Sequence, residues 1–193
     1  MVEKYTKLKT ATAAIIRQVF VGAGRGQLDR DAFERKLYII RKALGHAIRA
    51  LGLSNAGEFY VPSFSHRTIV YKGLVTGGRL SELYPDLRAP LTLGYAVFHQ
   101  RYATNTHPVW RLAQPFRSIA HNGEINTVRG NREQVRGRTA DAGTDRGVAV
   151  DLLEAGPLLS PDGSDSLSLD EALELLTTTG WALTPALLAA IPE

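Results

Sequence analysis

The sequence predicts an α+β fold, and three observations support this prediction. One long segment carries apolar residues at helical spacing, several shorter segments are rich in β-branched and aromatic residues, and the two kinds of segment do not alternate as strict βαβ units. At 193 residues the chain is long enough to form one domain with a hydrophobic core. Its hydrophobic content of 44% and charged content of 22% are ordinary for a soluble globular protein.

The long segment predicts an amphipathic helix over residues 31–51. Acidic Asp29 and Asp31 stand at its start, and Gly52 follows its end. Because an apolar stripe needs a partner surface, we expect this helix to lie on a sheet. The stripe consists of Phe33, Leu37, Ile40, Leu44, Ile48 and Leu51.

The remaining elements follow from local composition. Strands are predicted at residues 58–63, 67–72, 91–101 and 118–121. Helices are predicted at residues 79–84, where Pro85 halts the helix, at 127–138 as a polar surface helix, and at about 168–178. Ser168 and Glu171 have the spacing of a capping box at the start of the last helix.

Charge and composition exclude several classes of function. The formal net charge is +4, but the densest basic cluster is interleaved with Glu133 and Gln134, which indicates a solvated helix face rather than a nucleic-acid interface. No apolar run is long enough to cross a bilayer, and no secretory signal is recognisable, so we expect a cytoplasmic protein without membrane contact. The cluster consists of Arg129, Arg132, Arg136 and Arg138.

The chain contains no cysteine, which excludes disulfide bonds and thiolate metal sites. His99, His107 and His121 do not have the spacing of a known metal-ligand motif, and no acidic ligand stands beside them. We therefore expect no metal site.

Three polar positions have both a chemical and a structural interpretation. Arg101 can grip a carboxylate with its two-pronged guanidinium group, or it can form a surface salt bridge. Asn122 and Gly123 can form an oxyanion hole, or they can be the turn of a hairpin. Asp165 can bind a substrate ammonium group, or it can be an acid at the cap or first turn of a helix.

Taken together, these residues lie in long motifs that resemble one family. The motifs are HQRYATNT at 99–106, PFRSIAHNGEINTVRGN at 115–131 and GSDS at 163–166, with RQVF at 17–20, FERKLY at 33–38 and SHRTIVYKG at 65–73. In this order they resemble the class II glutamine amidotransferase domain of glutamate synthase large subunits. The resemblance runs from about Ile15 to the end of the chain, which divides it into an unassigned segment, 1–14, and an incomplete amidotransferase domain, 15–193.

The resemblance implies part of a four-layer αββα sandwich with antiparallel sheets, the fold of the N-terminal-nucleophile hydrolases. It implies that glutamine is hydrolysed to glutamate and ammonia for glutamate biosynthesis and ammonia assimilation. Arg101 would bind the glutamine α-carboxylate with Thr104 nearby, Asn122 and Gly123 would form the oxyanion hole, and Asp165 would bind the α-amino group. The complete oxidoreductase would carry FMN and an iron–sulfur cluster in other domains of the large subunit, with a possible small subunit as a further partner; this segment itself would carry no cofactor.

The family's nucleophile is an N-terminal cysteine, which this sequence lacks. We therefore expect an internal fragment that shows no glutaminase activity alone. Because that cysteine lies on a strand of the family's fold, we also expect the isolated chain to fold poorly or to self-associate. Two alternatives stay open: a non-catalytic module that binds glutamine or a partner protein, and a fragment without function.

Overall fold

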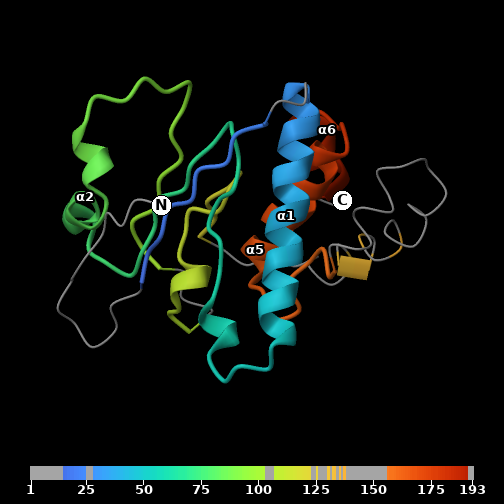
Figure 1. The fold of residues 1–193 in the computed structure, drawn as a ribbon, viewed down its shortest axis with the longest axis horizontal. Helices are drawn as coiled ribbons and strands as arrows, with labels where there is room; N and C mark the ends of the chain where they lie inside the picture. Colours follow the sequence, from blue (N-terminus) through green and yellow to red (C-terminus); the bar gives the residue numbers. More distant parts are fainter. Residues whose placement is uncertain are drawn as a thin grey trace.

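The computed structural model describes residues 15–24, 28–102, 107–122 and 156–190, together with single positions between 125 and 137. The α-helices are α1 (Arg30–Ala50), α2 (Leu80–Leu83), α5 (Asp165–Thr178) and α6 (Leu183–Ala190). Short 3-10 helices are η1 (Ala56–Glu58), η2 (Gly77–Arg79), η3 (Pro85–Arg88) and η4 (Trp110–Leu112). Figure 1 shows α1, α5 and α6 gathered together, with α2 apart from them across a set of coil segments.

Helix α1 confirms the predicted start and end of the long amphipathic helix. Asp29 caps the helix, because its Oδ1 atom accepts a hydrogen bond of 2.6 Å from the Ala32 N–H group. After Ala50 the chain turns at Gly52, whose φ of +65° lies in the left-handed region that favours glycine.

The buried face of α1 differs from the predicted apolar stripe. Leu37 and Tyr38 are buried, but the other buried residues are the cations Arg41 and Lys42. The predicted stripe residues Ile40, Leu44 and Leu51 are exposed instead. Among the described helices α1 packs mainly against α5, and the carboxylates of α5 explain why cations lie on this face. The sheet that we expected beneath α1 is not seen within the described residues.

Helix α5 exists as predicted but begins three residues earlier. Its cap is Ser164, whose Oγ atom accepts a bond of 3.2 Å from the Leu167 N–H group. The predicted capping box of Ser168 and Glu171 is therefore wrong, since both residues lie within the helix and are buried. Glu171 instead forms an ion pair with Lys42, at 2.9 Å between Nζ and Oε1.

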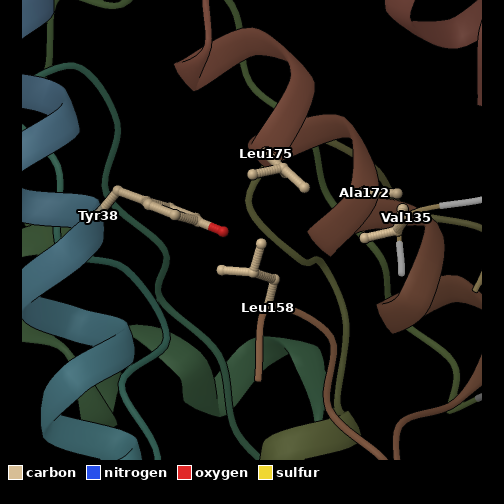
Figure 2. Close-up of a cluster of buried hydrophobic side chains, with 5 residues drawn as sticks. All are labelled: Tyr38, Val135, Leu158, Ala172 and Leu175. Carbon is tan, nitrogen blue, oxygen red and sulfur yellow. The ribbon is translucent and has the colours of Figure 1, made fainter. Parts of the chain in front are cut away.

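The core is built around α5, which is buried on nearly all sides. One cluster joins it to α1, with Tyr38 pointing toward Leu175 and Leu158 (Figure 2). A second cluster joins α5 to α6 through Leu173 and Ala186, both fully buried. A third cluster consists of Leu112, Phe116 and Leu167, with Tyr102 and Ile119 packed against it.

The predicted strands are not confirmed. Within the described residues no segment is assigned as a strand, and the backbone hydrogen bonds outside the helices join residues no more than five positions apart. The segments 58–63, 67–72, 91–101 and 118–121 run as coil, apart from Glu58, the last residue of η1. A strand requires a paired backbone, so composition alone does not produce one. The two antiparallel sheets stay a prediction.

Two shorter helices agree with their predicted positions. The predicted helix at 79–84 is α2, with Arg79 as the last residue of η2, and Pro85 begins the separate turn η3. Residues 130, 132, 133, 135 and 137 are helical, in accordance with the predicted helix over 127–138. That helix is not purely a surface helix, because Val135 belongs to the first cluster. No helix in the described ranges has the length and apolarity to cross a bilayer.

Candidate functional site

The segment from Gln114 to His121 is a loop closed by a side chain. The Gln114 amide donates through Nε2 to the His121 carbonyl oxygen, and its Oε1 atom accepts from the His121 N–H group, both at 2.6 Å. Inside the loop the Phe116 N–H group donates to the Ile119 carbonyl oxygen at 2.9 Å. Gln114 is 9% exposed, so water competes little for these bonds. The loop ends directly before Asn122.

Asp170 of α5 holds the same loop from the other side. Its Oδ1 atom accepts from the Ser118 N–H group at 2.7 Å, and its Oδ2 atom accepts from the Arg117 guanidinium group at 3.1 Å. Arg117 also faces Glu174, with 3.4 Å between Nε and Oε1. Because Asp170 is fully buried, this carboxylate fixes the loop to α5 about 1.4 turns from Asp165.

Lys72 supports the chain just before Gln114. Its ammonium group donates to the carbonyl oxygens of Arg111 and Ala113, both at 2.8 Å. It also lies over the rings of Tyr60 and Phe116, at 5.3 and 5.0 Å from their centres. Burial lowers the pKa of Lys72 to about 7, and the nearby Arg117 charge acts in the same direction.

Asp165 is the first residue of α5, in the turn that Ser164 caps. The structural interpretation, a first-turn acid, therefore holds, although the capping side chain is Ser164. Arg132 fixes this turn, because its guanidinium group donates to the Gly163 carbonyl oxygen at 2.8 Å and to Ser168 Oγ at 2.9 Å. Arg132 is thus not part of the solvated basic face that the sequence predicted.

Arg101 is exposed at the end of a coil segment, and Asn122 is exposed after the loop. Thr104 and Gly123 lie outside the described residues. Arg101, Asn122 and Asp165 are not joined to one another by a hydrogen bond or ion pair in the part of the chain that the structure describes.

The segments that carry these three residues nevertheless meet in the third cluster. Tyr102 follows Arg101, Phe116 lies in the Gln114 loop, and Leu167 lies in the first turn of α5, and all three pack together. Tyr102 is also held by its hydroxyl group, which donates to the His107 carbonyl oxygen at 3.0 Å and accepts from the Val109 N–H group at 3.1 Å. The fold thus gathers an arginine, an asparagine and an aspartate segment around one apolar cluster.

A separate hollow lies at the start of α1. Its lining includes Asp31 and Arg67, which form an ion pair at the surface, and His66. His66 bonds the Arg30 carbonyl oxygen at 2.9 Å and lies 3.5 Å from Glu34. These side chains bind one another, and none of the predicted site residues lines this hollow.

Sequence reasoning missed four polar residues that shape the site: Lys72, Gln114, Arg132 and Asp170. A signal for Gln114 was present, because it directly precedes the recognised motif at 115–131. Nothing local indicated the others, since their partners lie 31 to 53 positions away in the sequence. Within the described residues no group of three or more histidine and acidic side chains could hold a metal ion.

Comparison with known proteins gives a consistent picture. The family model described as class-II glutamine amidotransferases matches residues 2–193. The chain is 40% identical over 179 residues to the glutamate synthase [NADPH] large chain of Bacillus subtilis, and 41% identical over 179 residues to ferredoxin-dependent glutamate synthase 2 of Synechocystis. Both matches cover 92% of this chain and 11% of the relative.

A chloroplastic ferredoxin-dependent glutamate synthase of Oryza sativa is 39% identical over 196 residues, covering 100% of this chain and 12% of the relative. The chain therefore spans about a tenth of the length of the curated relatives it matches. The remaining length of those relatives comprises other parts that this sequence does not include.

Proposed function

The chain belongs to the class-II glutamine amidotransferases, and from this premise we propose that it is the glutamine-binding portion of a glutamate synthase large chain. In the parent protein this portion hydrolyses glutamine to glutamate and ammonia. The family's fold is that of the N-terminal-nucleophile hydrolases. The four-layer arrangement with two antiparallel sheets is part of the proposal. A domain that begins near Ile15 is also part of it, since the structure does not describe residues 1–14.

The observation that carries the proposal is the meeting of three segments at the third cluster. Glutamine is a zwitterion with a carboxamide side chain, so its site needs a cation, an anion and donors for the amide oxygen. Arg101, Asp165 and Asn122 supply these three kinds of group from segments that Tyr102, Leu167 and Phe116 pack together. We assign Arg101 to the α-carboxylate and Asp165 to the α-amino group.

Asn122 and Gly123 are proposed as the oxyanion hole, and Thr104 as a further contact in the same pocket. An amide side chain and a glycine N–H group stabilise the negative charge that develops on the carboxamide oxygen during attack. The attacking group must come from a part of the parent outside this sequence, because the sequence contains no cysteine. We therefore expect the chain alone to bind glutamine without hydrolysing it.

The parent's cofactors are part of the same proposal. By family resemblance the complete enzyme uses FMN and an iron–sulfur cluster to consume the released ammonia. A cysteine-free chain cannot supply the thiolate ligands of such a cluster, so other domains would hold it. Those domains and a small subunit are the expected partners, and the cytoplasm is the expected compartment.

The absence of cysteine also favours a second candidate. A chain with a glutamine pocket and no thiol can act as a non-catalytic module that binds glutamine or a partner protein. The two candidates differ in turnover: joining the cysteine-bearing segment of a relative to this chain should produce glutaminase activity only if the catalytic interpretation is right.

Calorimetric titration of the chain with L-glutamine tests the shared part of both candidates. We expect Arg101→Lys and Asp165→Asn each to weaken binding by about tenfold or more, because charge-assisted hydrogen bonds contribute about 1.5–3 kcal/mol and every 1.4 kcal/mol is about tenfold in affinity. Arg49→Lys, at the exposed end of α1, is the matched control and should change nothing. Unchanged affinity in both site variants would contradict the assignment.

A second ligand separates the two contacts. The compound 4-carbamoylbutanoate resembles glutamine without its α-amino group. It should bind the unchanged chain and the Asp165→Asn variant equally, whereas Arg101→Lys should weaken its binding. If Asp165→Asn weakened both ligands alike, its effect would be structural and the ammonium contact would be wrong.

A further inference from the structure

The Gln114 side chain replaces a backbone segment in the loop before Asn122. Its amide donates to the His121 carbonyl oxygen and accepts from the His121 N–H group, both at 2.6 Å, which is the exchange of bonds that a paired strand residue makes. Both backbone groups of His121 are therefore fixed by one buried side chain. The next residue along the chain is Asn122.

The chain on both sides of Gln114, at residues 111–113 and 117–118, is held by hydrogen bonds to Lys72 and Asp170. Lys72 bonds the carbonyl oxygens of Arg111 and Ala113, just before Gln114. Asp170 bonds Arg117 and the Ser118 N–H group, so the far side of the loop is fixed to α5. Gln114 thus connects this fixed part of the chain to His121, the residue that directly precedes Asn122.

We propose that Gln114 is a positioning residue for glutamine recognition, which holds His121 so that the Asn122 side-chain amide faces the glutamine carboxamide. This inference rests on the proposed function and extends it to a residue outside the predicted pocket. Gln114 acts through the backbone of His121, and an oxyanion hole works only when its donors are held in place before the reaction.

The test uses the full chain labelled with ¹⁵N and titrated with L-glutamine. In the unchanged chain, glutamine should shift the NMR signal of the Asn122 side-chain amide. Gln114→Met keeps the length of the side chain but removes both bonds to His121. We expect this variant to lose most of the glutamine-induced shift of the Asn122 signal. The His121 amide should exchange with solvent about tenfold faster, and the affinity for glutamine should fall by no more than about threefold.

Gln114→Glu distinguishes a positioning role from a merely structural one, because the effect of this variant on the Asn122 signal should depend on pH. Its carboxylate still accepts from the His121 N–H group but cannot donate to the His121 carbonyl oxygen. When the carboxyl group is protonated, it regains a donor and again pairs with both backbone groups. Burial should raise the pKa of this carboxyl group above its usual value of about 4.3, so the Asn122 shift in this variant should recover as the pH falls from 7 through that raised pKa. The unchanged chain should show no pH-dependent gain of this kind.

Leu175→Ala is the control for lost stability, since Leu175 belongs to the first cluster and not to the loop. It should leave the Asn122 shift intact. An equal loss in Leu175→Ala and Gln114→Met, or an unchanged Asn122 shift in Gln114→Met, overturns the positioning role while glutamine binding still stands. An unchanged chain that shows no glutamine-induced shifts overturns the proposed function itself, and the positioning role with it.

Discussion

Apolar side chains have opposite fates in α5 and in the segment 91–98. Leu173 of α5 is fully buried, whereas Phe98 is 88% exposed. A helix satisfies its own backbone hydrogen bonds, so α5 needs only packing partners, which α1 and α6 supply. The segment 91–98 has the composition of a strand, but in the described residues no other backbone pairs with it. An element that satisfies its own backbone hydrogen bonds, such as α5, is therefore formed and packed. A segment that needs a neighbouring strand, such as 91–98, leaves its apolar side chains exposed.

The difference is sharpest for buried charge. Asp170→Ala removes the acceptor of Arg117 and of the Ser118 N–H group inside the core. We expect a loss of about 3–5 kcal/mol in the free energy of unfolding, since the buried Arg117 cation keeps only Glu174 as a carboxylate partner among the described residues and the Ser118 N–H group loses its acceptor. Urea denaturation measures this loss. Asp162→Ala is the control: Asp162 is 72% exposed and pairs with Arg111, so its loss should cost about 0–1 kcal/mol. Equal effects would break the comparison.

Apolar truncation compares the two regions directly. Leu173→Ala should cost about 2–5 kcal/mol, because it leaves a cavity between α5 and α6. Phe98→Ala should change the free energy of unfolding by no more than about 0.5 kcal/mol, because the ring is already in solvent. A loss at Phe98 as large as that at Leu173 would show that the segment 91–98 is covered in solution.

Lys72 adds a pH dependence to the packed region. Its pKa falls from 10.5 to about 7 on folding, because burial disfavours its charge, with contributions from Arg117 and Arg111 that Asp170 opposes. The unfolded chain therefore binds more protons between these two values, and stability should rise with pH above 7, by at most about 1.4 kcal/mol per pH unit. Thermal melts of the chain and of Lys72→Met from pH 7 to 9 measure this difference. A difference that is constant with pH would refute the shifted pKa.

The exposed apolar segment should also make the chain self-associate. Leu91, Leu93, Tyr95, Val97 and Phe98 are between 43% and 88% exposed. A patch of this kind promotes association, and a strand-like segment can pair with a second copy. Size-exclusion chromatography should show species larger than a monomer, and Tyr95→Lys with Phe98→Lys should shift the chain toward the monomer. A monomer at all concentrations would contradict this prediction.

The sequence indicated elements whose signals are local. The Asp29 cap and Gly52 defined α1, and Pro85 defined the end of α2. Sequence analysis failed for features that depend on side chains far away in the sequence. The cap of α5 is Ser164 rather than Ser168, because Glu171 is engaged by Lys42, 129 positions away. The burial of Arg41 likewise depends on Glu174.

The candidate site divides in the same way. Motif resemblance supplied Arg101, Asn122 and Asp165. Arg101 precedes Tyr102, which packs against the third cluster, Asn122 follows the loop that carries Phe116, and Asp165 lies two positions before Leu167. Lys72, Arg132 and Asp170 could not be derived from spacing, because each acts on a segment that is brought near only by folding. Periodicity shows which elements exist, but it does not show which polar side chains will connect them.

Amide hydrogen exchange with and without L-glutamine tests the central claim most directly. If the three segments form one glutamine site on a preformed helical base, glutamine should slow exchange at residues 99–102, 114–122 and 163–168 together. Exchange in α1 should stay unchanged. Protection confined to the hollow at residues 29–31 and 66–67, or no protection at any residue, would contradict the account.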